Sequence, residues 1–301
     1  MRIVSLLPAA TEIVAELGAI DQLVGVTHEC DWPEAVRTLP RVTSSAVAVR
    51  ARAGEVDAQV RALAASGGAL FTLDEGLIRS LAPGVICTQA LCDVCAVSET
   101  EVRALARRLP GPPRVITLSA TRLDAVFGDI EIVARAIGAA DEAEELVAGL
   151  RARLRRVHET LKAAKATRPR VAVIEWSDPI YAAGHWVPEM IKRAGGVDVL
   201  AQPGAHSVTV TVDAVRAADP EVLLVSPCGY GAARALAEAK RMLARPEWAW
   251  ARTRRVWALD ANGIVSRPGP RLVTGVEAMA AAMHPGLFSP PAPEYARQVA
   301  T

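Results

Sequence analysis

Short apolar segments of strand length alternate with amphipathic segments of helical length along most of this chain. The first apolar segment spans residues 3–6, a helical pattern follows at 11–17, and a second apolar segment comes at 23–26. Two strands joined through a helix form a βαβ unit, in which the strands run parallel. The same alternation predicts strands at 70–73, 85–88, 115–118, 171–175, 222–226 and 256–259, and helices at 56–65, 75–81, 99–109, 188–194, 212–218, 232–243 and 271–283. The pattern therefore predicts an α/β protein.

The alternation stops between residues 121 and 166, where no segment has the pattern of a strand. Residues 141–166 instead predict one long helix, rich in Ala, Leu, Glu and Arg and without proline. Because the alternation resumes afterwards, this helix is typical of a spacer between two lobes. We therefore expect an N-terminal α/β lobe at 1–120, a helical linker at 121–167 and a C-terminal α/β lobe at 168–301.

Chemically distinctive side chains follow several of the predicted strands. In open α/β sheets, ligands bind beyond the carboxyl ends of the strands. These positions hold His28, Cys30 and Trp32 after 23–26, Cys92 and Cys95 after 85–88, and Glu175, Trp176, His185, Trp186, Cys228 and Tyr230 in the second lobe. Their gathering at the strand ends of two lobes predicts a ligand cleft lined by both.

Cys92 and Cys95 are separated by two residues, a spacing that suits three chemistries. Such side chains can hold zinc or an iron–sulfur cluster, form a redox dithiol, or pack as small apolar groups. The redox alternative is weaker because a thioredoxin-type thiol opens a helix, whereas here a capping box of Ser98 and Glu101 starts the helix later. A metal site would draw its ligands from His28, Cys30, Cys92, Cys95 and Cys228.

His185 and Trp186 follow a glycine in a loop of the second lobe, and two roles stay open for them. They can form an imidazole ligand beside a flat aromatic wall, with Trp176 as a second wall, or they can pack inside the lobe. Glu175 can ligate a metal, orient a ligand or pair with an arginine. Simpler roles are expected elsewhere: Cys87, Trp248 and Trp250 in packing, His206 in a surface turn, and His158 and His284 in solvent.

Composition narrows the class of protein. With 34 basic and 33 acidic residues among 301, the net charge of +1 argues against a nucleic-acid-binding surface. No run of 18 apolar residues occurs, so a membrane span is not expected. Pro8 and Glu12 interrupt the first apolar run, which is unlike a secretory leader. We therefore expect a cytoplasmic protein, or a periplasmic or extracellular one if a leader lies upstream of Met1.

Several motifs resemble those of a known family. The opening Arg2-Ile-Val-Ser-Leu-Leu-Pro-Ala-Ala-Thr-Glu12 and the long central helix are similar to class III solute-binding proteins, the helical-backbone metal receptors of ABC importers. Four further motifs resemble a subgroup labelled cobalamin-binding: His28-Glu-Cys-Asp31, Cys92-Asp-Val-Cys-Ala-Val97, Gly184-His-Trp-Val-Pro-Glu189 and Arg267-Pro-Gly-Pro-Arg271. The resemblance covers essentially the whole chain. It implies two Rossmann-like lobes on a rigid helix, with Trp32, Trp176, Trp186 and Tyr230 as ligand contacts.

Two departures from that family concern its transport partner. Members carry a secretion leader and present a glutamate on each lobe to arginines of the permease. The matching positions here hold Gly76 and Lys192. Neither residue can form the charge pair, and Lys192 would repel an arginine. We therefore expect no docking of this kind to an ABC permease.

Together, the residues and the resemblance predict a non-enzymatic protein that binds a small metal-containing ligand. Cobalamin or another corrinoid is favoured, with His185 as an axial ligand. Three alternatives stay open. They are a zinc or iron site formed by the cysteines and His28, a conventional importer receptor for cobalamin, haem or a siderophore, and a thiol-dependent redox enzyme using Cys92 and Cys95.

Overall fold

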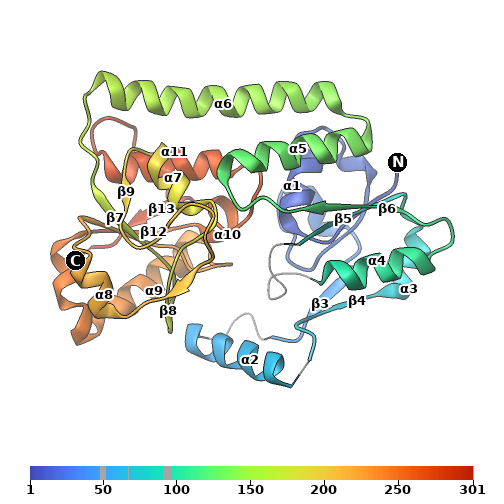
Figure 1. The fold of residues 1–301 in the computed structure, drawn as a ribbon, viewed down its shortest axis with the longest axis horizontal. Helices are drawn as coiled ribbons and strands as arrows, with labels where there is room; N and C mark the ends of the chain where they lie inside the picture. The colour runs from blue at the N-terminus through green and yellow to red at the C-terminus, as the bar shows by residue number, and fades with distance from the viewer. Residues whose placement is uncertain (48–51, 67, 91–96, 301) are drawn as a thin grey trace. The chain divides into compact units, whose positions relative to one another are not determined.

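The computed structural model describes residues 1–47, 52–66, 68–90 and 97–300, and its contacts divide the chain into two units. Unit 1 comprises Met1–Ala120 and Asp124–Ala148, and unit 2 comprises Thr121–Leu123 and Gly149–Thr301. Each unit contains a sheet with helices packed on it, which confirms the predicted α/β class (Figure 1). The boundaries of the three expected segments and the cleft expected between the lobes stay predictions.

Unit 1 is built on a parallel four-stranded sheet with the order β2-β1-β5-β6. Its strands are β1 (Ile3–Ser5), β2 (Leu23–Val26), β5 (Val85–Gln89) and β6 (Arg114–Leu118), and its helices are α1 (Pro8–Glu16), α2 (Ala53–Ala65), α3 (Glu75–Leu81), α4 (Glu99–Arg108) and α5 (Leu123–Ile137). Short 3-10 turns lie at Ile20–Gln22 and Glu34–Thr38, and β3 (Thr43–Ser45) pairs antiparallel with β4 (Phe71–Leu73). The strand order reverses between β1 and β5, and in sheets of this kind ligands usually bind beyond the carboxyl ends of the strands at such a point.

The core of unit 1 follows from alternation along its strands. Val4 on β1 and Ile86 on β5 pack with Ile78 of α3 and Leu105 of α4 on one face of the sheet. Cys87, whose side chain points to the opposite face, is fully buried, and burial raises the pKa of its thiol to about 12. This thiol therefore stays protonated, in agreement with the expected packing role.

Unit 2 has a larger, mixed sheet with the order β10-β8-β7-β11-β12-β13, and β9 also pairs with β7. Its strands are β7 (Arg170–Ser177), β8 (Ile180–Ala182), β9 (Val197–Asp198), β10 (Val208–Thr209), β11 (Val222–Val225), β12 (Arg255–Leu259) and β13 (Ala296–Gln298). Its helices are α7 (Val187–Arg193), α8 (Val212–Ala217), α9 (Ala232–Ala244), α10 (Ala261–Ile264) and α11 (Leu272–Met283), with a 3-10 segment, η3, at Pro246–Thr253. Figure 1 shows α7 and α11 on one side of this sheet and α8 and α9 on the other.

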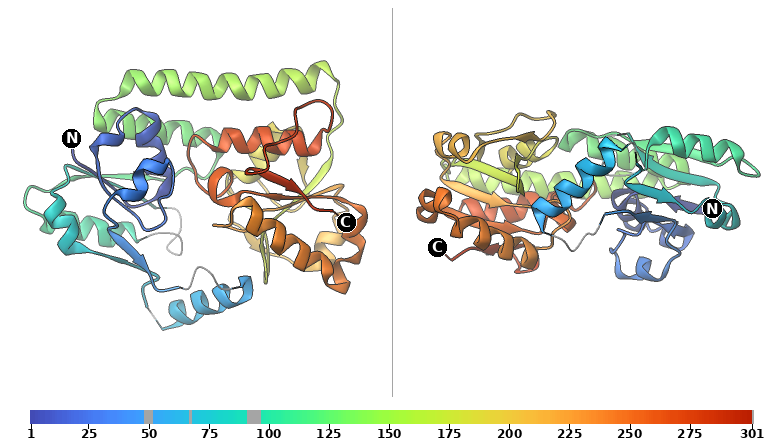
Figure 2. Two further views of the ribbon diagram at one scale, coloured as in Figure 1. Left: turned by 180° about the vertical axis from the view of Figure 1, so that it is seen from behind. Right: turned by 90° about the horizontal axis from the view of Figure 1, so that it is seen from below.

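The long helix expected at 141–166 is present as α6 (Ala140–Ala163), which runs without a break in Figures 1 and 2. Its second half is anchored inside unit 2, because the Arg153 guanidinium lies 2.6 Å from the Glu277 carboxylate and donates to Thr274 at 2.8 Å. His158 on this helix is exposed, as expected.

His284 is not in solvent, contrary to the expectation for it. Its residue is buried at the end of α11, with the ring beside Gly195, which carries no side chain. Burial lowers the pKa of this imidazole. The expectation failed because the neighbouring Pro285 marks the end of a helix but says nothing about what packs there.

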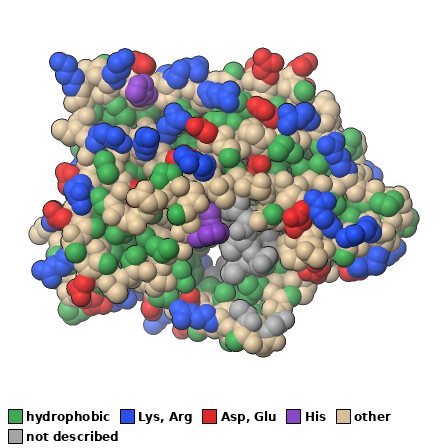
Figure 3. Space-filling view, viewed as in Figure 1, with side chains coloured by type: hydrophobic (Ala, Val, Ile, Leu, Met, Phe, Trp, Pro, Cys, Tyr) green, Lys and Arg blue, Asp and Glu red, His purple; other side chains and the backbone are tan. Residues whose placement is uncertain are grey.

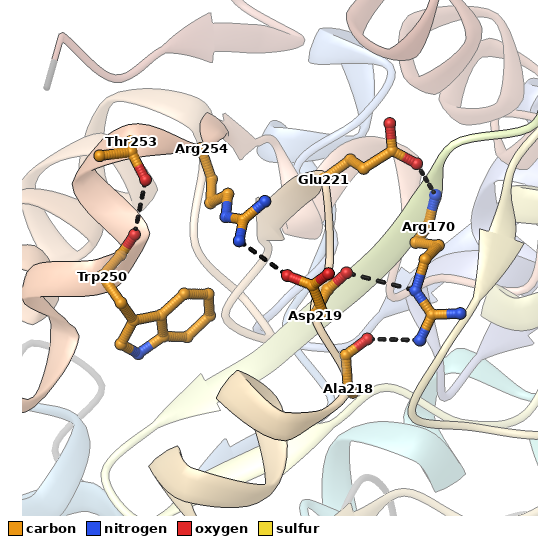
Figure 4. Close-up of polar contacts among 7 residues, drawn as sticks. All are labelled: Arg170, Ala218, Asp219, Glu221, Trp250, Thr253 and Arg254. Atoms are coloured by element: carbon orange, nitrogen blue, oxygen red, sulfur yellow. Dashed lines mark hydrogen bonds and ion pairs between the residues drawn. The ribbon is translucent and has the colours of Figure 1, made fainter.

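The amino-terminal edge of the unit 2 sheet is held together by its own polar groups (Figure 4). The Arg170 guanidinium donates to the carbonyl oxygens of Ala218 (2.5 Å) and Asp219 (3.2 Å), and the Arg170 N–H donates to Glu221 (2.9 Å). The Asp219 carboxylate accepts from Arg254 at 2.7 Å. Because these polar groups hydrogen-bond to each other, we assign them a structural role at this edge of the sheet.

Trp248 and Trp250 have the packing role expected of them. Their rings stack with centroids 5.8 Å apart, and Trp248 is fully buried in the core of unit 2. The Trp250 carbonyl accepts from the Thr253 hydroxyl at 3.0 Å, which closes the turn that carries both rings (Figure 4).

Asp198 gives unit 2 a predicted pH dependence. One carboxylate oxygen accepts from the N–H groups of Leu200 and Ala201 at 2.9 and 3.0 Å, while Oδ2 is buried without a partner among the described residues. Burial raises the pKa of this carboxyl to about 6. The folded state therefore holds more protons than the unfolded state between about pH 4 and 6, and stability falls as the pH rises through this window.

Asp198→Asn removes the buried charge and keeps an oxygen acceptor for both N–H groups. We expect it to raise the free energy of unfolding at pH 7.5 by about 1–3 kcal/mol, since each pKa unit corresponds to about 1.4 kcal/mol. Urea unfolding at pH 4 and 7.5 measures both effects. A variant as pH-dependent as the wild type would show that another group is responsible.

Candidate functional site

Trp176 and Tyr230 meet at the carboxyl end of the unit 2 sheet. Trp176 is the seventh residue of β7 and Tyr230 lies in the loop between β11 and α9. Their ring centroids are 5.7 Å apart in an edge-to-face arrangement, and the Arg234 guanidinium lies over the Tyr230 ring at 3.6 Å from its centroid. Tyr230 is only 3% exposed, while Trp176 is half-buried. Trp176 is therefore a partly exposed indole held by the buried Tyr230 ring, and Arg234 places a cation beside that ring.

Hydrogen bonds hold the loops around this aromatic pair. The Cys228 N–H donates to the Glu175 carbonyl at 3.1 Å, and the Asn262 N–H donates to the Tyr230 carbonyl at 3.1 Å. The Asn262 side chain accepts from Arg267, a residue only 7% exposed, at 2.8 Å. Three strand ends, those of β7, β11 and β12, are thus joined into one surface.

The structure adds polar residues that the sequence interpretation did not single out as site residues: Arg234, Asn262 and Arg267. Arg234 lies in the first turn of α9, whereas Tyr230 precedes the helix, so no helical spacing in the sequence pointed to their contact. Asn262 lies just beyond β12, and Arg267 is the first residue of a motif that carried part of the family resemblance.

His185 lies in a loop that is tightly joined to residues 204–207. Its N–H donates to the Ala205 carbonyl at 2.6 Å, and the Gly204 N–H donates to the His185 carbonyl at 2.8 Å. His185 has φ +53°, a left-handed conformation that is uncommon for a residue with a side chain. Burial, followed by the positive charge of His206, lowers the pKa of the His185 imidazole. This ring is therefore neutral at neutral pH.

Glu175 is linked to the same pair of loops through Ser207. The Ser207 hydroxyl donates to the Glu175 carboxylate at 2.8 Å and accepts from the Gly184 N–H at 3.2 Å. His206 is exposed, as a turn residue should be, but its ring contacts His185, with centroids 5.2 Å apart. The sequence interpretation had not paired these two histidines.

Trp186 packs inside unit 2, and its predicted role as a ligand contact stays a prediction. It is 6% exposed, and its indole N–H donates to the Val265 carbonyl at 2.7 Å. Nearby, the Glu189 carboxylate accepts from the Arg122 guanidinium and, at 2.7 Å, from the Leu123 N–H. The motif around Trp186 thus contributes much to the internal structure of unit 2.

In unit 1, the loop after β2 holds three of the predicted site residues. Nδ1 of His28 lies 2.7 Å from the Thr43 hydroxyl, and burial, followed by the charge of Arg41, lowers the pKa of this imidazole. Cys30 is buried with its sulfur 3.1 Å from the Thr11 hydroxyl, and Trp32 is half-buried. His28 and Cys30 are therefore held by local contacts.

The predicted metal set stays a prediction. Cys92 and Cys95 lie outside the described residues, and Cys228 is exposed in unit 2. Among the residues that are described, no group of three or more His, Cys, Asp or Glu side chains is arranged to hold a metal ion.

The surface positions expected at a permease interface are accessible. Gly76 in the first turn of α3 and Lys192 near the end of α7 are both exposed. Figure 3 shows basic side chains interspersed with acidic ones on the face that it displays, in keeping with a net charge near zero. Within the described residues, no helix has the length and apolar character needed to cross a membrane.

The class of this protein follows from its fold together with a family match. Residues 93–262 match the model of the family described as periplasmic binding protein, and the chain belongs to this family. It is therefore a solute-binding protein and not an enzyme, which confirms the family resemblance and removes the redox-enzyme alternative.

Individual relatives cover nearly the whole chain. It is 26% identical to an uncharacterised ABC transporter substrate-binding lipoprotein of Bacillus subtilis, over 95% of this chain and 81% of the relative. It is 24% identical to a vitamin B12-binding protein of Vibrio cholerae, over 92% and 86% of the two chains. These relatives are named as a lipoprotein or as vitamin B12-binding, and they give no support to the expected cytoplasmic location.

Solved structures confirm the fold. A periplasmic haem-binding protein of Pseudomonas aeruginosa superposes with a TM-score of 0.74 at 23% identity, covering 100% of this chain and 98% of the other. The periplasmic vitamin B12-binding protein of Vibrio cholerae gives a TM-score of 0.62 at 22% identity, covering 94% and 96%.

Proposed function

We propose that this protein binds a metal-containing macrocycle, with cobalamin or another corrinoid as the first candidate. The observation that carries the proposal is the aromatic pair Trp176 and Tyr230 at the carboxyl end of the unit 2 sheet. A macrocycle presents a broad apolar face that packs well on the exposed part of the Trp176 indole, and its polar rim needs hydrogen-bonding partners. Glu175 beside Trp176 and Arg234 beside Tyr230 supply an acceptor and a donor. The relative named as vitamin B12-binding supports this choice.

Haem is the second candidate, and His185 is the residue that favours it. Its Nε2 atom is buried and has no hydrogen-bond partner within the described chain, and the ring is neutral at neutral pH. A neutral imidazole is a common axial ligand of haem iron. The same nitrogen would also suit the cobalt of a corrinoid, so the ring by itself does not choose between the two macrocycles.

We also propose a transporter partner for this protein, but with a contact different from the glutamate–arginine pairs expected in the family. A substrate-binding lipoprotein of an ABC transporter is among the relatives, which supports an importer role. Gly76 and Lys192 cannot supply acidic side chains, so we propose that any permease contact does not use a glutamate–arginine pair at these two positions.

The proposal is tested by titrating the full chain with cyanocobalamin, aquocobalamin and haemin. Each titration is followed by calorimetry and visible absorption. We expect saturable binding of one cobalamin per chain, with a shifted spectrum for aquocobalamin if an imidazole replaces its water. Binding of haemin alone would select the second candidate. A protein that binds none of the three would contradict the proposed function.

A further inference from the structure

Two histidines from separate loops of unit 2 meet at the edge of its sheet. His185 follows β8 and His206 precedes β10, and their rings are nearly perpendicular, at 89°, with centroids 5.2 Å apart. Both loops are fixed, since residues 184 and 185 exchange hydrogen bonds with 204, 205 and 207. The backbone therefore fixes the places from which the two side chains extend.

The close approach of these loops depends on Gly184. A side-chain carbon at this position would lie 2.5 Å from the Ala205 carbonyl oxygen and 2.6 Å from the His206 carbonyl carbon. His185 next to it holds its left-handed φ of +53°. Unusual backbone conformations of this kind persist where the surrounding structure imposes them and are often found at functional sites.

The ring separation matches two imidazoles on one tetrahedral ion. A zinc ion lies about 2.0–2.1 Å from a coordinating imidazole nitrogen, which puts it about 3.2 Å from the ring centroid. At a tetrahedral angle, two such centroids are about 5.2 Å apart, and the observed separation is 5.2 Å. A macrocycle held between two axial imidazoles would require centroids on opposite sides of the metal, at least about 6 Å apart.

The chemical state of His185 also suits an ion. Its Nε2 atom is buried and lacks a hydrogen-bond partner in the described part of the chain. A buried polar atom left unpaired costs about 1–3 kcal/mol, and a bound ion is one of the accepted explanations for such an atom. Because the ring is neutral at neutral pH, a lone pair is available for coordination.

We propose that His185 and His206 form a two-imidazole site for a divalent ion of the zinc type, with water in the remaining positions. The site differs from the cysteine-containing set predicted from sequence. It uses the same His185 nitrogen as the proposed axial ligand of the macrocycle, so zinc and a macrocycle metal would compete for this atom. His206 is exposed, so its ring can turn its nitrogen toward the ion. Glu175, which accepts from Ser207 next to His206, adds negative potential near the site.

The proposal is tested by titrating the full chain with zinc after a chelator has removed bound metal. The titration uses a chromogenic chelator as competitor and contains no macrocycle. We expect one zinc ion per chain, and zinc binding at least about tenfold weaker in His206→Ala and in His185→Asn. Loss of a residue that only hydrogen-bonds a metal ligand already lowers metal affinity by about 10–100-fold. Asparagine is chosen at position 185 because it tolerates a left-handed φ. The matched control is His158→Ala, which removes an exposed imidazole from α6 and should bind zinc like the wild type.

A second measurement keeps the test decisive if His185→Asn folds poorly. Zinc should raise the melting temperature of the wild type and of His158→Ala but not that of His206→Ala. Wild-type zinc affinity in His206→Ala would overturn the proposal, as would loss of zinc in His28→Ala or Cys228→Ser with retention in His206→Ala. Cobalamin titration of zinc-free His206→Ala separates the two proposals. Because this variant keeps His185, we expect its cobalamin affinity to equal that of the zinc-free wild type.

Discussion

Gly275→Ala is expected to lower the free energy of unfolding of unit 2 by about 3 kcal/mol or more. Gly275 lies within α11 where this helix crosses α10, and a side-chain carbon there would be 2.1 Å from the Ile264 carbonyl oxygen and 2.6 Å from the Met190 side chain. The methionine can move, but a backbone carbonyl cannot turn away without displacing α10. The residue after α10, Val265, accepts the Trp186 hydrogen bond, so the disturbance also reaches the packing of Trp186.

Calorimetry measures this effect, and a loss of about 3 kcal/mol corresponds to a melting temperature lower by about 6–12 °C for a unit of this size. Gly149→Ala is the matched control, since Gly149 is an exposed residue within α6 with no atom near the added carbon. There, the same substitution should raise the free energy of unfolding by about 0.5–1 kcal/mol, because alanine has a higher helix propensity than glycine. Equal melting temperatures for the two variants would show that α10 and α11 are not packed this closely.

Elements with strong local signals were predicted well from the sequence. The strand at 23–26 and the helix at 75–81 have the bounds expected, and the predicted cap at Ser98 accepts from the Glu101 N–H at 3.3 Å. The missed strands are two or three residues long and most are antiparallel, such as β8 and β10, whose two pairs are Val208 with Ala182 and Thr209 with Tyr181. Such short strands form only because a partner strand is present, and no hydrophobic periodicity in the sequence predicts them. The 15-residue helix α5 was covered only by the expected helical linker at 121–167, and α10 and the 3-10 segments were not predicted.

In the candidate site too, residues placed by local sequence patterns were predicted, and contacts between segments distant in the sequence were not. Trp176 and Tyr230 were predicted from their places after strands, because the carboxyl ends of parallel strands converge. The contact between His185 and His206 was not predicted, since the two residues are 21 positions apart and neither lies on a regular element. Gly184 and Gly204 were the only local signs of a close approach, and glycines also occur in ordinary turns.

Trp176→Ala is expected to weaken cyanocobalamin binding by about 30–100-fold, a loss of about 2–3 kcal/mol, if the proposed function is correct. The substitution removes the exposed part of the aromatic surface and leaves Tyr230 buried beneath it. The loss should lie in affinity and not in stoichiometry, because the loops around the site are held by backbone hydrogen bonds that do not involve the indole. Calorimetric titration at one temperature and salt concentration measures it.

Trp250→Ala is the matched control for this loss of affinity. Trp176 and Trp250 are both partly buried indoles packed against the same core of unit 2, but Trp250 lies in η3 and stacks on Trp248, away from the strand ends. The two variants should therefore lose stability to a similar degree, while only Trp176→Ala loses affinity. Equal affinity losses in both would assign the effect to a loosened core, and unchanged affinity in Trp176→Ala would move the ligand away from this aromatic surface altogether.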